Sequence, residues 1–225
     1  MQKDKVKQYE QLEQACKTLC LSPTERQKDQ LLEYLSQLLK WNQTYNLTAI
    51  RDPEQALIQH VFDSLAVIKP ITVYFFAHHI KLETILDVGS GAGLPAVVLG
   101  IMLPSTQICC VDPVGKKMTF VRQAVGILKL SNVDAVQKRV ENVETGPYDL
   151  VISRAFASLE DFARLAGNKV KTKGLLLAMK GKHPQEEIEN LENKTSWKVE
   201  KIEPVKVPQL DAQRCLVWMK DKGTK

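Results

Sequence analysis

Three glycines at alternate positions follow a short apolar run near the middle of the chain. Residues 85–88 predict a buried strand, and Gly89, Gly91 and Gly93 then allow a tight turn that approaches a ligand without Cβ atoms in the way. Asp112 ends the next apolar run, 23 positions after Gly89, where a carboxylate accepts hydrogen bonds from a ribose diol. These residues predict a binding site for the nucleoside part of a cofactor.

The spacing of the glycines and the position of one acid favour a cationic cofactor. A pyrophosphate-binding loop has the pattern G-x-G-x-x-G, whereas this chain has G-x-G-x-G with Leu94 in place of the last glycine. Asp87 lies two residues before Gly89, which is unfavourable beside two phosphates and favourable beside a positive charge. The pattern is similar to the first motif of the S-adenosylmethionine (SAM) methyltransferases, so SAM is the expected cofactor and S-adenosylhomocysteine the product. A glycine-rich turn without any cofactor is the alternative.

The elements that must position this loop alternate along the second part of the chain. Strands are expected at residues 83–88, 107–112, 133–137, 148–153, 174–179, 197–205 and 213–220, and helices at 94–103, 114–129, 158–170 and 184–192. Such alternation predicts an α/β, Rossmann-like fold around a mostly parallel sheet of seven strands. The last two strands have no helix between them, so we expect an antiparallel final hairpin.

The first part of the chain is helical in pattern. Residues 22–25 read as a capping box with proline at the first helical position, and residues 52–55 repeat this start signal. The second of these helices is expected to end before Pro70. We therefore expect a helical N-terminal extension over residues 1–80, packed on a SAM-binding methyltransferase domain over residues 81–225.

The composition is that of an ordinary soluble domain. Hydrophobic residues make up 44% of the 225 residues, charged residues 25%, and the net charge is +5. The five cysteines are odd in number and lack the paired spacing of zinc ligands, so we expect no metal and a reducing, cytoplasmic setting. No secretory signal and no apolar run long enough to span a bilayer is visible. We expect a monomer that does not bind membranes.

Basic residues gather in two stretches that are expected to flank the site-bearing edge of the sheet, where they are either solvated lysines or contacts for a polyanionic substrate. Residues 164–182 contain six basic residues and no acid, and residues 112–139 contain six against two acids. The expected phosphate or RNA contacts are Lys116, Lys117, Lys180, Lys182, Asn46 and Arg51. For Asn46, satisfying a turn is the alternative role.

Seven short motifs occur in one order: W-N-x-x-x-N-L-T-A-I-R-D, H-x-x-D-S-L, D-V-G-S-G-A-G-L-P, D-x-x-x-K-K, R-V-E, S-R-A-F and M-K-G. Together they closely resemble the bacterial 16S ribosomal RNA guanine-N7 methyltransferases, also called glucose-inhibited division protein B, from about Pro23 to Lys220. The resemblance implies a SAM-dependent Rossmann-like fold with a helical N-terminal extension. It also implies methyl transfer to N7 of a guanine in 16S rRNA of the small ribosomal subunit.

The resemblance places the cofactor contacts on residues of this chain. They fall on Gly89, Leu94, Val140, Glu141 and Arg154, with Asp112 near the ribose. The local pattern agrees, because Val140 and Glu141 follow the third expected strand and Arg154 lies at the carboxyl tip of the fourth, beside the topological switch point. The chain departs from the family pattern at Ala96, where glycine is usual, and at Pro113, where serine is common.

The expected chemistry follows from the acceptor atom. Ser153-Arg154-Ala155-Phe156 stands where methyltransferases of exocyclic amines often carry an N/D-P-P-aromatic turn. Guanine N7 is a nucleophile without losing a proton, so placement in line with the methyl group suffices. Arg154 and Lys180 are expected to contact O6, phosphate or the cofactor, because a cation on N7 would block the lone pair. His60 and Asp63, one helical turn apart, are expected to form a structural hydrogen bond.

Three other functions stay open at this point. A dehydrogenase would bind NADH, and a small-molecule methyltransferase would use the helical segment as a lid and leave RNA unlabelled. An RNA-binding assembly factor with a vestigial pocket would not bind SAM. Binding measurements and the fate of a labelled methyl group separate these alternatives.

Overall fold

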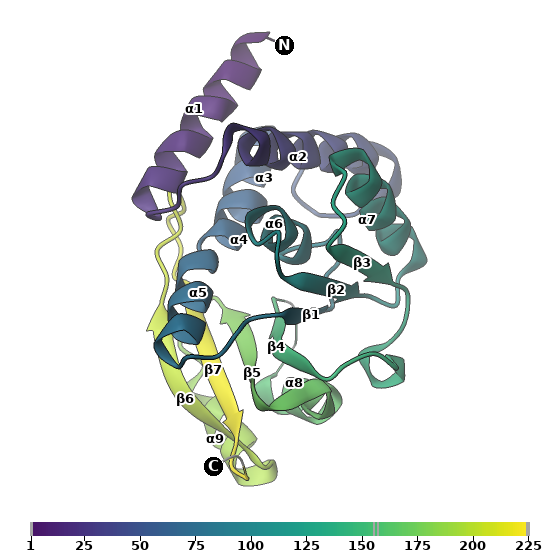
Figure 1. The fold of residues 1–225 in the computed structure, drawn as a ribbon. Helices are drawn as coiled ribbons and strands as arrows, with labels where there is room; N and C mark the ends of the chain where they lie inside the picture. Colours follow the sequence, from purple (N-terminus) through teal and green to yellow (C-terminus); the bar gives the residue numbers. More distant parts are fainter. Residues whose placement is uncertain (1, 155, 157, 224–225) are drawn as a thin grey trace.

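The computed structural model describes residues 2–154, 156 and 158–223. Seven strands form one sheet in the order β3-β2-β1-β4-β5-β7-β6, with helices on both faces (Figure 1). The strands are β1 (Thr84–Val88), β2 (Gln107–Val111), β3 (Val133–Val136), β4 (Tyr148–Ser153), β5 (Val170–Lys180), β6 (Trp197–Pro204) and β7 (Cys215–Asp221). The first five run parallel, and β7 pairs antiparallel with both β5 and β6. The expected α/β sheet and its antiparallel hairpin are confirmed.

The helices form two layers of unequal size. They are α1 (Gln2–Thr18), α2 (Glu25–Tyr45), α3 (Pro53–Ala56), α4 (Asp63–Leu65), α5 (Ile68–Ala77), α6 (Ala96–Met102), α7 (Gly115–Leu128), α8 (Leu159–Ala166) and α9 (Gln185–Lys194). Short π or 3-10 turns are η1 (Leu57–Phe62), η2 (Val140–Asn142) and η3 (Gly167–Lys169). Because side chains alternate along a strand, Ile85 packs in the larger core with α2, α6 and α7, and Leu86 packs in the smaller core with α8.

The N-terminal helices attach to the part of the sheet that carries the glycine loop. The Tyr34 hydroxyl of α2 donates to the Ala92 carbonyl of that loop at 2.7 Å and is fully buried. Gln30 and Gln27, one and two turns earlier, donate to the carbonyls of Leu128 and Ile101 at 2.7 and 2.8 Å. The extension therefore braces the loop and both helices that follow it.

Of two expected helix boundaries, one is wrong and one is confirmed. The capping box of α2 is formed by Thr24 and Gln27, not by residues 22–25, so the helix begins at Glu25. Gln27 is the third residue of the helix, where a capping box has Glu or Gln, and its side-chain amide also donates to the Ile101 carbonyl. The helical run that begins at Pro53 ends at Leu65, before Pro70 as expected, and Pro70 lies in the first turn of a further helix, α5, where proline is tolerated because the N–H groups there lack intrahelical partners.

The run from Pro53 to Ala77 is apolar because it is buried. It is 25 residues long and by length and composition resembles a membrane span, but 72% of its most apolar window lies inside the fold. Asp52 caps its start by accepting from the Gln55 N–H at 2.8 Å, as the start signal predicts. The π-helical turn Leu57–Phe62 then rotates the following residues relative to a regular α-helix.

The structure also corrects the expected boundary near residue 170. The predicted helix over 158–170 ends at Ala166, and β5 begins at Val170 instead of residue 174. At Gly167 a Cβ would lie 2.7 Å from Trp197 Nε1, so the chain turns there under a large buried ring. Val170 can then pair with Tyr148 at the start of β4.

Candidate functional site

The glycine loop connects β1 to α6 at the carboxyl edge of the sheet. The N–H groups of Gly89 and Ser90 both donate to the Val111 carbonyl at the end of β2, at 2.8 and 3.2 Å. Gly89 and Gly91 have φ values of +70° and +59°, and a Cβ at either position would meet no atom within 4 Å. Space for a ligand therefore lies beside these two glycines. Gly93 differs, because its Cβ would lie 2.7 Å from Val97.

Asp112 is fixed beside the same loop. Its Oδ2 accepts from the Gly91 N–H at 3.0 Å and its Oδ1 accepts from the Val114 N–H at 2.8 Å. Lys117 Nζ lies 3.8 Å from Oδ2. A carboxylate offers about four acceptor positions, so it can still receive a ribose hydroxyl. The predicted pair of glycine loop and acid is thus brought together in space.

Asp87 fits a cationic ligand. It is fully buried at the end of β1, and its Oδ2 accepts from the Ala96 N–H at 3.0 Å, while its Oδ1 has no partner among the described residues. Burial raises the pKa of this carboxyl to about 7, although the Ala96 N–H and the charge of Arg154 act in the opposite direction. A sulfonium and ammonium compound such as SAM would supply the missing positive charge. The methyl group of Ala96 is accommodated without loss of this contact.

The remaining predicted cofactor residues lie along the same edge. Leu94 is buried at the end of the glycine loop, and Val140 is buried in the 3-10 turn η2 that follows β3. Glu141, in the same turn, is exposed. Because β3, β2, β1 and β4 are neighbours and run parallel, their carboxyl ends face one side. Contacts of these residues with SAM stay a prediction.

A second cavity, of about 400 Å³, lies at the carboxyl ends of β4 and β5. It is lined by Ile50, Gln59, His60, Asp63, Arg154, Met179, Lys180, Gly181 and Arg214. Asp63 is 4% exposed and lies between two arginines: Arg214 Nε donates to Oδ1 at 2.9 Å, and Arg154 Nη1 lies 3.5 Å from Oδ2. Arg154 also donates to the Gln59 carbonyl at 3.2 Å. Five separate segments of the chain build this cavity.

His60 and Asp63 do not form the expected hydrogen bond with each other. His60 Nε2 instead lies 2.9 Å from Thr48 Oγ1, and Asp63 forms ion pairs with Arg154 and Arg214. The physical reason is the π-helical turn over 57–62, which changes the spacing of side chains that a regular helix would bring together.

Lys180 lines this cavity but is engaged in the fold. Its Nζ lies 2.7 Å from Glu187 Oε2 and donates to the Phe156 carbonyl at 3.3 Å. It therefore connects the end of β5 to α9 and to the segment after β4. Ala155 of the S-R-A-F motif lies outside the described residues. A direct role of Lys180 or Arg154 in methyl transfer stays a prediction.

The predicted RNA contacts fall into two groups. Lys116 and Lys117 lie in the first turn of α7 and Lys182 follows β5, all at the carboxyl edge. Asn46 and Arg51 bind each other, with Nη2 donating to Oδ1 at 2.8 Å, and Asn46 ends α2 with a φ of +48°. Its turn role is therefore observed, and RNA binding by these residues stays a prediction.

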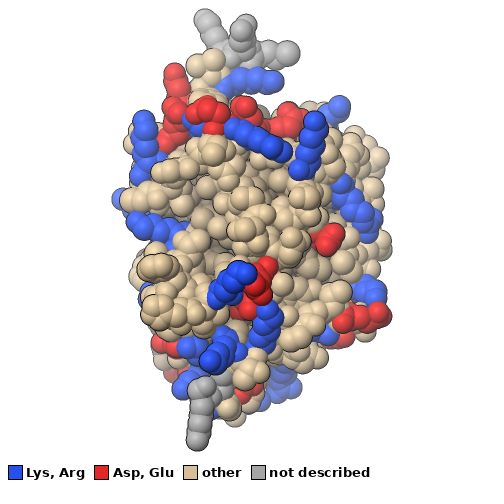
Figure 2. Space-filling view, in the orientation of Figure 1, with Lys and Arg blue, Asp and Glu red and all other residues tan. Residues whose placement is uncertain are grey.

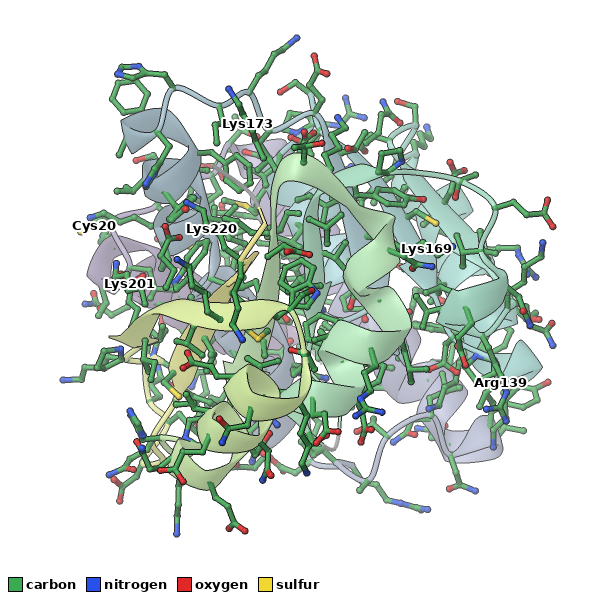
Figure 3. All side chains as sticks on the ribbon, turned by 90° about the horizontal axis from the view of Figure 1, so that it is seen from below. Cys20, Arg139, Lys169, Lys173, Lys201 and Lys220 are labelled. Atoms are coloured by element: carbon green, nitrogen blue, oxygen red, sulfur yellow. The ribbon has the colours of Figure 1, made fainter. Side chains whose placement is uncertain are left out.

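The expectation that residues 164–182 flank the site-bearing edge is confirmed for Lys180 and Lys182 and wrong for the residues at the start of β5. Lys171 and Lys173 lie at the start of β5, which is parallel to β4, so they are at the edge opposite the glycine loop. Lys171 there forms an ion pair with Asp149 at 2.9 Å. Figure 3 shows Lys169, Lys173 and Arg139 spread apart. On the face in Figure 2, acids lie among the basic side chains, so this face is not uniformly basic.

Sequence reasoning missed part of the cavity. Arg214 lies just before β7 with no motif or periodicity around it, and its meeting with Asp63, 151 residues earlier, arises only from the fold. Asp63 was assigned to a local hydrogen bond. The sequence signal that points to this cavity is the density of polar residues in an otherwise apolar helical run. Within 2–154, 156 and 158–223, no cluster of three or more His, Cys, Asp or Glu side chains has metal-binding geometry.

Comparison with protein families identifies close relatives. A sequence profile described as rRNA small subunit methyltransferase G matches residues 27–217. "Ribosomal RNA small subunit methyltransferase G" of Bordetella petrii is 54% identical over 214 residues, which is 95% of this chain and 83% of the relative. The protein of the same name from Bordetella avium is 54% identical over 96% of this chain and 95% of its own length.

Solved structures share the fold at low sequence identity. A SAM-dependent methyltransferase from Aquifex aeolicus superposes with a TM-score of 0.53 at 18% identity, over 75% of this chain and 98% of the other. A SAM-dependent methyltransferase from Leishmania major superposes with a TM-score of 0.58 at 14% identity, over 83% of each chain. These likenesses establish the Rossmann-like methyltransferase fold.

Proposed function

The chain belongs to the rRNA small subunit methyltransferase G family, and from this premise we propose that it transfers a methyl group from SAM to N7 of a guanine in 16S rRNA. It is a SAM-dependent methyltransferase, which excludes a dehydrogenase and an assembly factor that does not bind SAM. The proposed partner is 16S rRNA within the small ribosomal subunit, and the proposed setting is the cytoplasm, with the protein acting as a monomer.

Residues of the carboxyl edge would hold the cofactor. Gly89 and Gly91 leave room for it, Asp112 would accept the ribose hydroxyls, and Asp87 would face its positive charge. Bound SAM supplies an electrophilic methyl: its bond to sulfur breaks as the bond to N7 forms, and the positive charge passes from sulfur to the purine. The helical residues 1–80 and the domain of residues 81–225 would act as one unit, because Tyr34 supports the loop directly.

One observation carries the choice of a ring nitrogen as acceptor. The cavity beside Asp87 holds an acid already engaged by Arg154 and Arg214, and a histidine whose pKa is lowered to about 4 by burial and by Arg154. A histidine with so low a pKa is a weak base, and the Asp63 carboxylate is occupied by its two ion pairs. An acceptor such as N7, which has a free lone pair and loses no proton, suits such a cavity.

The test is mass mapping of 7-methylguanosine in small-subunit RNA from cells with and without this protein. We expect one guanine to lose its N7 methyl group in the deletion strain and to regain it when purified protein and SAM are added. Unchanged RNA, or label appearing in small metabolites, would contradict the proposal. Single-turnover transfer by Arg154→Ala and Lys180→Ala at saturating SAM then tests these two residues, and wild-type rates would remove them from the mechanism.

A further inference from the structure

His60 has one ring nitrogen engaged by the fold. Its Nε2 lies 2.9 Å from Thr48 Oγ1, and that oxygen accepts from the Ile50 N–H at 3.2 Å. The Thr48 hydroxyl keeps its own proton and can donate it to Nε2, and in that tautomer the proton of the neutral ring is on Nδ1. Thr48 is itself fixed, because its N–H donates to Asn42 Oδ1 at 2.9 Å. The fold thus sets the orientation of the His60 ring.

The other ring nitrogen is buried and unpaired. His60 is 5% exposed, and its Nδ1 has no hydrogen-bond partner in the described part of the chain. Hydrogen bonding by the Gln59 backbone raises the pKa of His60, against burial and the charge of Arg154, which lower it, and the Gln59 carbonyl also accepts from Arg154 Nη1 at 3.2 Å. A buried donor without an acceptor is unfavourable by about 1–3 kcal/mol. Such a group in the wall of a cavity indicates a ligand acceptor.

The cavity that His60 lines is next to the cofactor site. Arg154 follows β4, the neighbour of β1, and the charge of Arg154 influences the pKa of Asp87 at the end of β1. Met179 adds an apolar wall from β5. A flat base in this cavity would find apolar surface and one fixed donor beside the place where the methyl group is delivered.

We propose that His60 recognises the target guanine, with Nδ1–H donating to O6 while N7 remains free to accept the methyl group. This assignment rests on the proposed function and adds the residue that selects the base. Guanine presents two acceptors, N7 and O6, on its major-groove edge, whereas adenine presents an amino group in place of O6. The adenine amino group would face the Nδ1–H donor, so adenine is rejected. A neutral His60 also adds no repulsion when the purine becomes cationic.

The test compares two isosteric variants in transfer to small subunits that lack the methyl group. His60→Gln keeps an amide near Thr48 Oγ1 and removes the donor at Nδ1, and His60→Asn places an amide N–H near the Nδ1 position. We expect kcat/KM to fall about 10- to 100-fold in His60→Gln, with SAM affinity within about 2-fold of wild type, and to recover partly in His60→Asn. Equal activity of wild type and His60→Gln would overturn the assignment.

A second measurement separates base recognition from a structural role. Subunits are reconstituted with 2-aminopurine, which has N7 but no O6, at the methylated position. We expect this replacement to slow the wild-type enzyme about 10- to 100-fold more than it slows His60→Gln, because the variant has already lost the bond to O6. Equal slowing of both enzymes would contradict the proposal.

The controls keep this inference distinct from the proposed function. Absence of any transfer to small-subunit RNA by the wild-type protein overturns the proposed function itself. Normal wild-type transfer together with an unaffected His60→Gln overturns only the role of His60. If His60→Gln fails to bind SAM, the wild type and His60→Asn are compared instead in their rates on guanine and on 2-aminopurine. An identical ratio of these two rates in both enzymes would count against the proposal.

Discussion

The glycine loop and the neighbouring cavity are built in opposite ways. The loop is made by the backbone of consecutive residues, 87–93, closed against the end of β2 by short hydrogen bonds. The cavity is made by side chains from η1, α4, the ends of β4 and β5, and the residue before β7. A binding site made of consecutive backbone can be recognised from sequence, whereas one assembled from distant side chains requires the fold.

The two regions also differ in how their acids are used. Asp87 in the loop region is buried with one oxygen unpaired, which suits an incoming cation. Asp63 in the cavity is buried with both oxygens engaged by arginines, which fixes the wall. The difference places an electrostatic attraction for the cofactor beside a preorganised surface for the base.

The largest expected effect is in the cavity. Asp63→Ala leaves Arg154 and Arg214 without their shared carboxylate, and we expect a loss of about 2–3 kcal/mol in the free energy of unfolding, below the full cost of a buried pair because both arginines are partly exposed. Methyl transfer should fall at least about 100-fold, since the wall of the cavity loses its fixed geometry. Urea unfolding and single-turnover assays measure both. The control is Asp211→Ala, which removes an exposed acid from the connection between β6 and β7. This variant should leave both the free energy of unfolding and the rate of methyl transfer unchanged.

The second effect tests the open space of the loop. Gly91→Ala puts a methyl group where a Cβ meets no protein atom, at a φ of +59°, so we expect SAM affinity to fall at least about 10-fold. Gly126→Ala is the matched control, because its Cβ also meets nothing but lies in α7, where alanine should stabilise the helix by about 0.5–1 kcal/mol. Calorimetry that finds equal SAM affinity in both variants would place the cofactor elsewhere.

The third effect concerns the acid of the loop region. The pKa of Asp87 is raised to about 7, so between about pH 4 and 7 the folded protein holds a proton that the unfolded chain has lost. Stability from this group is therefore present at low pH and decreases as the pH rises through that window. SAM affinity should do the reverse, rising from pH 5 to pH 8 as the carboxylate forms. Asp87→Asn should flatten both profiles, and a pH-dependent affinity that persists in this variant would exclude Asp87 as its source.

The smallest effect concerns the two edges of the sheet. Alanine at both Lys116 and Lys117 should flatten the salt dependence of RNA binding by about two phosphate contacts. The matched pair is Lys173 and Lys198, exposed lysines at the amino ends of β5 and β6 on the opposite edge, whose replacement should leave the slope unchanged. Filter binding across a salt series measures both slopes. Equal slopes in the two double variants would mean that RNA does not contact α7.

Local patterns predicted most of the sheet and part of the site. Each predicted strand exists, because an apolar run between turn residues has few ways to bury itself. The ends of α8 and β5 and the helix around Pro70 were missed, since packing against Trp197 and a π-helical turn overrode the local signals. The sequence singles out His60, Asp63 and Arg154, but it does not predict the contact of His60 with Thr48 or those of Asp63 with Arg154 and Arg214.

The sequence by itself determined the parallel sheet, the glycine loop and the acid at the end of β2, because each depends on residues adjacent in the chain or on a repeating period. Only the tertiary structure decided which side chains line the second cavity, which nitrogen of His60 contacts Thr48, and which lysines share an edge with the loop. These depend on contacts between residues up to 151 positions apart, and such contacts leave no periodic trace in the chain.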